Sequence, residues 1–152
     1  MADIKKSDFD IKFVTLTVGL GTFSPLTEEN LKNKQLHKEF YNIDKKTAQF
    51  LNKAKKDGRP IIAVGTTVVR TLESACKSSL LSKLSGNTDL FIREGYKFKF
   101  IDSIITNFHV PKSSLLMLVS AFAGRKELFG LYSLAANKKF KFYSFGDGMM
   151  IL

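Results

Sequence analysis

The sequence is short of several kinds of residue, and each shortage narrows what the chain can be. It has one cysteine, Cys76, and two histidines. One thiol cannot form an intramolecular disulfide or a multi-cysteine zinc site, and two histidines among scattered carboxylates show no metal-ligand spacing. We therefore expect no metal, and we expect Cys76 to be a small buried thiol rather than a nucleophile. A reducing, cytoplasmic setting fits best.

Long apolar runs are also missing. The stretch Leu115–Gly124 is about half of the roughly 20 residues that a membrane-spanning helix needs. The first eight residues hold no apolar stretch of the kind found in signal peptides. We therefore expect neither a membrane partner nor a secretory signal.

Acidic residues are outnumbered, with 14 Asp and Glu against 24 Lys and Arg, for a formal net charge of +10. This balance favours a polyanionic partner, with nucleic acid as the first candidate, although a solvated basic surface without such a partner is the alternative. With 152 residues, of which 44% are hydrophobic, the chain can bury one core and suits a single domain.

Apolar runs alternate with segments of helical periodicity. Ile11–Val18 reads as a strand, and so does Phe140–Phe145 near the other end of the chain. Ile61–Val64 is short and fully apolar, which is typical of a strand covered on both faces of a parallel sheet. The alternation predicts an α/β fold in which a mostly parallel sheet is flanked by helices.

Five short motifs place glycine or polar residues directly after an apolar run. They are Val18–Phe23, His37–Tyr41, Ala63–Ser74, Thr106–Pro111 and Ser144–Asp147. In a globular α/β domain such residues lie at strand ends, where a rigid sheet can present them to a ligand. These motifs supply the candidate site residues.

Gly65, Thr66 and Thr67 stand at a predicted strand-to-helix junction. Free backbone N–H groups and two hydroxyls there could bind a carboxylate or phosphate, although a plain helix cap would give the same pattern. Arg70 and Glu73 follow three residues apart on the same helix. They could form an ion pair with each other, or Arg70 could hold a substrate carboxylate by a two-point contact.

Two further motifs leave similar choices open. Gly19-Leu20-Gly21 allows close approach of a ligand to the backbone, but it lacks the third glycine of a dinucleotide fingerprint, and a tight turn explains it equally well. His37 and Glu39 would share one face of a strand and could accept and donate protons. On a solvated edge strand the same spacing would carry no function.

His109 lies between Asn107 and Pro111, at the end of a predicted apolar strand. An imidazole there could be presented to a substrate with its tautomer fixed by neighbours, or it could be a satisfied structural histidine. For base stacking the aromatic candidates are Phe40, Tyr41 and Phe108, with core packing as the alternative.

The five motifs, in this order and over nearly the whole chain from about Ile11, resemble the S-adenosylmethionine:tRNA ribosyltransferase-isomerase family of queuosine biosynthesis. The resemblance implies a transferase that moves and isomerises the ribosyl part of S-adenosylmethionine onto 7-aminomethyl-7-deazaguanine in the wobble position of a tRNA anticodon. The product is epoxyqueuosine, and adenine and methionine are released. S-adenosylmethionine is then the ribosyl-donating substrate, with no cofactor, and tRNA as the partner agrees with the basic charge.

The resemblance also selects individual residues, whose roles we infer. Glu39 and His109 are the catalytic candidates, one or the other transferring a proton at the ribose or the attacking amine. The residues implied to bind substrate are Gly19, Gly21, Thr22, His37, Thr66, Thr67, Arg70, Glu73 and Asn107. Within that set, Thr66, Thr67 and Arg70 are expected to face the methionine carboxylate or a phosphate.

Two departures from the family pattern stand out. Thr17 occupies a position where the family usually has a histidine. In addition, residues 1–152 match only the C-terminal portion of a larger α/β barrel-like domain, without the inserted β-barrel domain and the N-terminal segment. Such a portion should expose a sheet edge and apolar surface, pair with a missing N-terminal portion and be inactive alone. A basic RNA-binding remnant without catalysis remains the alternative.

Overall fold

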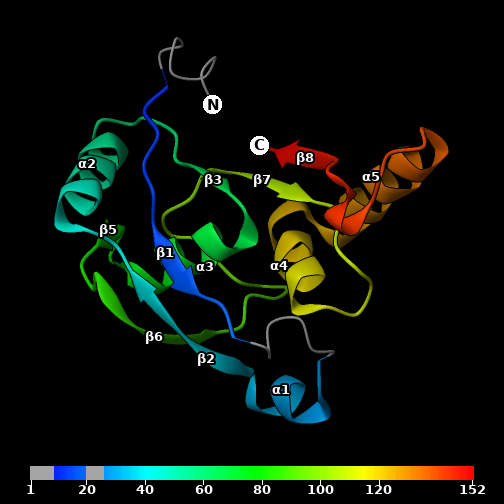
Figure 1. Cartoon of the computed structure of the whole chain (residues 1–152), viewed down its shortest axis with the longest axis horizontal. Coiled ribbons are helices and arrows are strands. Elements are labelled where there is room, and N and C mark those ends of the chain that lie inside the picture. The colour runs from blue at the N-terminus through cyan, green and yellow to red at the C-terminus, as the bar shows by residue number, and fades with distance from the viewer. Residues whose placement is uncertain (1–8, 20–25) are drawn as a thin grey trace.

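The computed structural model describes residues 9–19 and 26–152, and Figure 1 shows their arrangement. The elements in chain order are β1 (Thr15–Thr17), α1 (Glu28–Asn33), β2 (Gln35–Asn42), α2 (Lys45–Lys56), β3 (Ile62–Val64), α3 (Thr66–Ala75), β4 (Cys76–Lys77), β5 (Leu80–Leu81), β6 (Ser85–Leu90), β7 (Ser103–Asn107), α4 (Ser114–Ala123), α5 (Arg125–Asn137), the 3-10 helix η3 (Tyr143–Phe145) and β8 (Gly148–Ile151).

The strands form two three-stranded sheets and a small hairpin. One sheet has the order β1-β2-β6, the other has the order β3-β7-β8, and β4 pairs with β5. Helix α3 contacts strands of both sheets and lies near the middle of the molecule, with α4 and α5 to one side of it (Figure 1). The α/β class expected from the sequence is therefore confirmed.

The expectation of a mostly parallel sheet is wrong. Among the described strands, only β3 and β7 pair in parallel, and the other pairings are antiparallel. The apolar run at 61–64 correctly indicated that one parallel strand, but the expectation that both its faces are covered is wrong, because Val64 is exposed. Along β2, however, Glu39 and Tyr41 are buried while Phe40 and Asn42 are exposed. Such alternation is typical of a sheet with one solvated face, which antiparallel strands tolerate.

The predicted strand over 140–145 is also wrong. These residues form irregular backbone followed by η3, and the last strand comes later, at Gly148–Ile151. The alternation of Phe and Lys imitates a strand, but the ring of Phe142 stacks on Phe108 at 4.6 Å instead. Tyr143 has a φ of 63°, which does not occur in an extended strand.

Helix starts explain how the candidate site is built. The side chain of Asp44 caps α2 by accepting a hydrogen bond from the Thr47 N–H, and Ser113 caps α4 in the same way. In contrast, α3 follows Gly65, and no side chain caps it. The first N–H groups of α3 therefore lack both an intrahelical acceptor and a side-chain cap.

The core lies around α3 and between the two sheets. Its fully buried side chains include Val69, Phe100, Ile104, Val119 and Leu128. Cys76 is buried as expected, and burial, reinforced by the nearby Glu73 charge, raises the pKa of its thiol. Within the described residues, no helix is long and apolar enough to cross a membrane.

Candidate functional site

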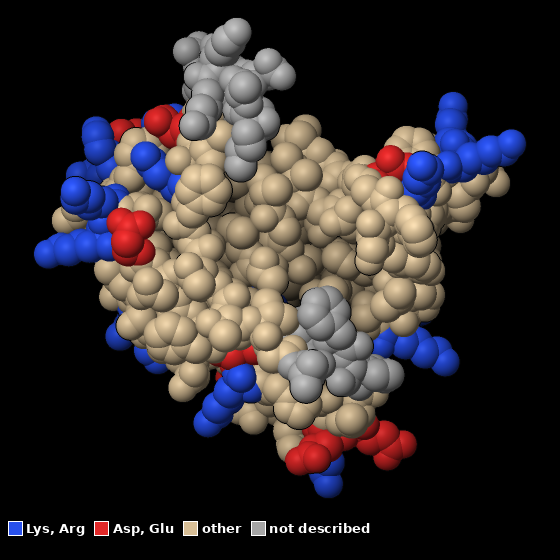
Figure 2. Space-filling model, viewed as in Figure 1, with Lys and Arg blue, Asp and Glu red and all other residues tan. Residues whose placement is uncertain are grey.

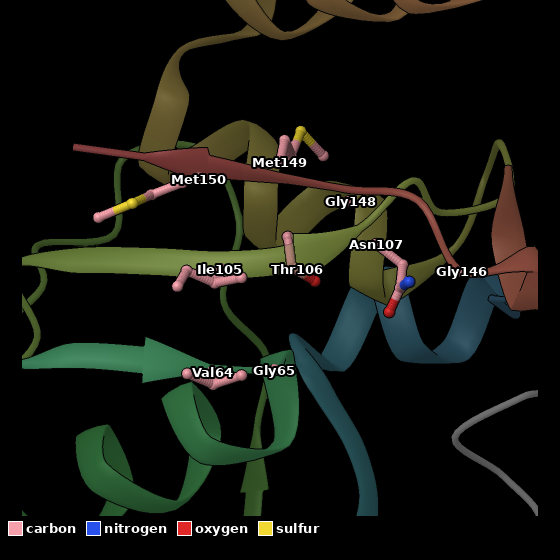
Figure 3. A pocket seen from close by; sticks show the side chains of 9 residues that line it. All are labelled: Val64, Gly65, Ile105, Thr106, Asn107, Gly146, Gly148, Met149 and Met150. Atoms are coloured by element: carbon pink, nitrogen blue, oxygen red, sulfur yellow. The ribbon is translucent and has the colours of Figure 1, made fainter. Parts of the chain in front are cut away.

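A pocket of about 440 Å³ opens where β3 and β7 end (Figure 3). Its walls come from the ends of these two parallel strands, from the start of β8 and from the turn before β8. The lining residues are Val64, Gly65, Ile105, Thr106, Asn107, Gly146, Gly148, Met149 and Met150. Ligands of α/β sheets bind outside the carboxyl ends of the strands, so this pocket is the candidate site.

Two glycines shape the pocket wall. Gly65 has a φ of 99°, and its N–H donates to the carbonyl oxygen of Ile105 at 2.8 Å, which ties the start of α3 to β7. A Cβ on Gly148 would lie 2.8 Å from the carbonyl oxygen of Thr106, a distance that no side chain can occupy without a backbone shift. The close approach of β8 to β7 therefore requires glycine at position 148.

Thr66 and Thr67 form the first turn of α3, next to Gly65. Thr66 is buried and Thr67 is half-buried. A helix N-terminus carries partial positive charge and free N–H groups, which suits a carboxylate or phosphate. The structure thus places the predicted anion-binding turn beside the pocket, with Gly65 as the lining residue.

Asn107 lies at the exposed end of β7 and lines the pocket. Its side-chain Nδ2 donates to the carbonyl oxygen of Asp147 at 3.1 Å, and its backbone pairs with Gly148. Figure 3 shows its amide beside Gly146. Asn107 therefore holds the turn before β8 in place, in addition to presenting an amide at the pocket rim.

His109 lies one side chain away from the pocket. Its Nε2 is 2.8 Å from the hydroxyl of Thr106, a lining residue, and its backbone N–H donates to the hydroxyl of Tyr132 at 2.6 Å. Burial lowers the pKa of His109, so the imidazole is neutral at neutral pH. One ring nitrogen is thus engaged by Thr106, and the catalytic role of His109 stays a prediction.

A second cluster lies on the other side of α3, between this helix and β2. Glu39 and Arg70 are both buried and form an ion pair, and Arg70 Nε also donates to the carbonyl oxygen of Leu90 at 3.3 Å. The other carboxylate oxygen of Glu39 accepts the Gly19 N–H at 3.2 Å. The pair therefore connects the start of the glycine-rich motif to α3.

Glu73 does not pair with Arg70. Its carboxylate accepts hydrogen bonds from the backbone N–H groups of Lys99, Phe100 and Ile101 and from the hydroxyl of Tyr96. Burial, reinforced by the Glu73 charge, raises the pKa of Tyr96. In this structure Glu73 fixes the segment that leads into β7.

The remaining predicted residues are scattered. His37 is exposed on β2 while Glu39 is buried, and a register irregularity lies between Gln35 and Glu39. Thr17 is exposed on β1 opposite Phe40. Gly21 and Thr22 lie outside the described residues. Among the residues that are described, no group of three or more His, Cys, Asp or Glu could hold a metal ion.

Sequence reasoning missed part of the pocket. Met149, Met150, Val64 and Ile105 carry no chemical signature, and only the strand pairing brings them together. Gly148 directly follows the Ser144–Asp147 motif, but the requirement for glycine there comes from the contact with Thr106.

A family model described as queuosine biosynthesis protein matches residues 1–151. The chain belongs to this family. Its relatives include the S-adenosylmethionine:tRNA ribosyltransferase-isomerases of Treponema denticola, at 53% identity over all of this chain, and of Carboxydothermus hydrogenoformans, at 50% identity over 95% of it. The chain covers 44% of the length of each, so it spans less than half of these queuosine-family relatives.

A solved member of the queuosine family has a similar structure. The crystal structure of S-adenosylmethionine tRNA ribosyltransferase from Thermotoga maritima matches with a TM-score of 0.70 and 46% sequence identity. The match covers 75% of this chain and 40% of that one. The fold described above is therefore part of a larger family fold.

Proposed function

We propose that the protein contributes to the tRNA-modifying transferase-isomerase reaction of queuosine biosynthesis. The ribosyl part of S-adenosylmethionine is transferred and isomerised onto 7-aminomethyl-7-deazaguanine at the wobble position of tRNA, giving epoxyqueuosine and releasing adenine and methionine. The observation that carries the proposal is the pocket between β3, β7 and β8, whose lining includes residues of three family motifs, Gly65, Asn107 and Gly146. The single buried thiol, Cys76, is consistent with a cytoplasmic protein.

The pocket offers polar groups that suit S-adenosylmethionine. The amide of Asn107 offers a hydrogen-bonding group at the rim. The uncapped first turn of α3, at Thr66 and Thr67, offers N–H groups to the methionine carboxylate. We propose no cofactor, because the donor is itself a substrate.

The geometry changes which residue we favour for the carboxylate. The Arg70 guanidinium already faces the Glu39 carboxylate, so its charge is balanced within the protein. The N-terminal turn of α3 carries no such partner charge. We therefore favour Thr66 and Thr67 over Arg70 for the substrate carboxylate, and we keep Glu39 and His109 as the candidates for proton transfer.

We also propose that the chain is a half-enzyme, completed by the N-terminal portion of the family fold. Val64 pairs with Ile105, and Ile105 pairs with Met150, so these three side chains form a row across the sheet. They are 64%, 36% and 52% exposed. An uncovered apolar row on a three-stranded sheet favours a covering partner. With that partner the two sheets would belong to a larger α/β barrel-like domain with the substrate cleft at the junction.

Adenine release tests the proposed reaction. The chain is mixed with S-adenosylmethionine and precursor-bearing tRNA, either alone or with a separately expressed polypeptide that carries the part of the Treponema denticola relative that this chain does not match. We expect adenine only from the mixture, because one half of a cleft cannot hold both substrates in reacting geometry. Turnover by the chain alone would contradict the half-enzyme, and no turnover in a confirmed complex would contradict the reaction.

Co-purification tests the apolar row separately. Val64→Asp places a charge in the row, and we expect it to prevent association with the added polypeptide. Phe13→Asp is the matched control, since Phe13 is equally exposed but lies outside the row. Equal co-purification of both variants would show that the row is not the interface.

A further inference from the structure

A short segment beside the pocket combines exposed aromatic rings with lysines. Residues 138–145, here called the aromatic-lysine segment, read Lys-Lys-Phe-Lys-Phe-Tyr-Ser-Phe. Phe140, Tyr143 and Phe145 are 46%, 45% and 76% exposed, and the three lysines are exposed as well. Gly146, which lines the pocket, follows directly. Three large rings on one exposed segment are unusual for a surface with no ligand.

The rings stand on a fixed backbone. Phe142 stacks on the buried ring of Phe108, Phe140 lies edge-on to Phe108 at 6.1 Å, and Tyr143 lies edge-on to Phe142 at 6.0 Å. The Tyr143 N–H donates to the Phe108 carbonyl oxygen at 3.0 Å, and the Lys141 N–H donates to the Asp147 carboxylate at 2.5 Å. The ring of Phe142 therefore anchors the segment, Phe140 and Tyr143 pack against the anchored rings, and Phe145 projects from this fixed backbone with 76% of its surface exposed.

The backbone of the segment is strained at a bulky residue. Tyr143 has a φ of 63°, in the left-handed region that side chains other than those of Gly, Asn and Asp rarely adopt. Such strain persists only where the surrounding contacts impose it, and it is concentrated at functional sites. At Tyr143 the contacts with Phe108 and Phe142 impose it.

Three lysines of the segment carry the charge that phosphates need, while the Asp147 carboxylate is engaged by the Lys141 N–H. Figure 2 shows Lys and Arg side chains gathered at the far end of α5, while the hollowed middle of this face carries none. Alternation of cations with exposed rings is how proteins bind unpaired nucleotides, because lysines follow the phosphates and rings stack on the bases.

We propose that the aromatic-lysine segment binds single-stranded RNA beside the pocket, with Phe145 stacking on an unpaired base. The inference rests on the proposed function, in which the second substrate is tRNA modified in its single-stranded anticodon loop. The segment would hold the nucleotides next to the reacting base, while the pocket holds the ribosyl donor. Phe40, which the sequence suggested for stacking, lies on β2, and the other two candidates, Tyr41 and Phe108, are buried.

Fluorescence anisotropy with a labelled single-stranded oligouridine of about ten nucleotides tests the proposal. We expect Phe145→Leu, which keeps apolar surface but removes the ring, to weaken binding about five-fold to a hundred-fold. Phe145→Tyr should bind like the unmodified chain. Lys141→Gln should lower the slope of affinity against salt, whereas Phe145→Leu should leave that slope unchanged. A thermal melt of each variant confirms folding.

Two controls separate the segment from general charge. Phe13→Leu changes an equally exposed ring elsewhere on the chain and should leave the affinity unaltered. A blunt RNA duplex of similar charge should bind the unmodified chain and Phe145→Leu equally, since its bases are already stacked.

The outcomes distinguish this inference from the proposed function. Equal oligouridine binding by the unmodified chain and Phe145→Leu overturns the stacking role of the segment and leaves the reaction standing. Loss of self-association or of association with the added polypeptide in Phe145→Leu, without any change in RNA affinity, assigns the segment to protein contact and overturns the inference too. Failure of the chain to bind either RNA at low salt overturns the segment and the tRNA partner together, whereas adenine release reports on the reaction itself.

Discussion

The two sides of α3 differ in what they bury. On the side of β2 and β6, the charged groups of Glu39 and Arg70 are buried and paired. On the side of β3, β7 and β8, the apolar side chains of Val64, Ile105 and Met150 face outward. Charged side chains are thus buried on the β2 and β6 side of α3, whereas apolar side chains are exposed on the β3, β7 and β8 side.

The two sides differ in how far their groups are matched within the chain. Buried polar groups are costly unless they are matched, and on the first side the Glu39 carboxylate has partners, although the buried Nη2 of Arg70 has no hydrogen-bond partner among the described residues. Exposed apolar rows are costly in water, and on the second side no described residue covers the row. The open side is therefore where ligands and further polypeptide are expected, and the closed side is expected to govern stability.

The largest effect is expected from the buried ion pair. Glu39→Gln leaves the Arg70 guanidinium buried without a matching charge, and we expect a loss of about 3–5 kcal/mol in the free energy of unfolding. Urea denaturation measures it. The double variant Glu39→Leu/Arg70→Met should lose less than the single variant. Asp10→Asn, which breaks the exposed pair with Arg59, should cost less than about 1 kcal/mol.

The second-largest loss of stability is expected from Glu73→Gln. The amide keeps the shape but loses the charge that accepts the N–H groups of Lys99, Phe100 and Ile101, so we expect a loss of about 2–3 kcal/mol in urea denaturation. If the stability were unchanged and S-adenosylmethionine binding were weaker, Glu73 would be a substrate-binding residue instead, and the contrast between the two sides of α3 would be weaker.

On the open side, Gly148→Ala should cost about 1–3 kcal/mol, because the new methyl group would push β8 away from the Thr106 carbonyl oxygen. Binding of S-adenosylmethionine by the reconstituted protein, measured by calorimetry, should weaken as the pocket wall moves. Gly130→Ala in α5 is the control. Its Cβ would meet nothing within 4 Å, and it should stabilise the chain by about 0.5–1 kcal/mol.

The smallest effect concerns His109 and pH. Burial lowers its pKa in the folded chain below the ordinary value of 6.5, so the unfolded chain binds the extra proton first as pH falls. Stability should therefore decrease as pH falls below about 6.5, by at most about 1.4 kcal/mol per pH unit and by less after solvent screening. His109→Gln should reduce this dependence in melts at about pH 7.5 and pH 5.5. Identical profiles would contradict a neutral buried imidazole.

Much of the local structure was predictable, because it depends on neighbours in sequence. Asp44 and Ser113 are residue types that favour helix starts, and each of them caps a helix, while the apolar run before Gly65 signalled a parallel strand. The Arg70 partner was not predictable. Helical spacing pointed to Glu73, whereas the fold brings Glu39 from a distant strand, and only tertiary contacts decide between the two carboxylates.

The candidate site was also predictable only in part. Asn107 and the turn at Gly65 belong to motifs at strand ends, and they meet at the pocket. The rings of residues 140–145 were misread as a strand, because alternation alone cannot separate a pleated strand from a segment pinned by one buried ring.

The pairing of the β3-β7-β8 sheet also bears on the order in which the protein folds. Ile62 pairs with Ser103, and Ile104 pairs with Ile151, so each pairing closes a long loop of chain. Closing such loops costs conformational entropy before any stabilising contact forms, so strand pairings between residues far apart in the sequence form slowly. The pocket is therefore assembled late, after the neighbouring strands β1 and β2 have been able to pair, and a nascent chain lacks the pocket until β8 has been synthesised.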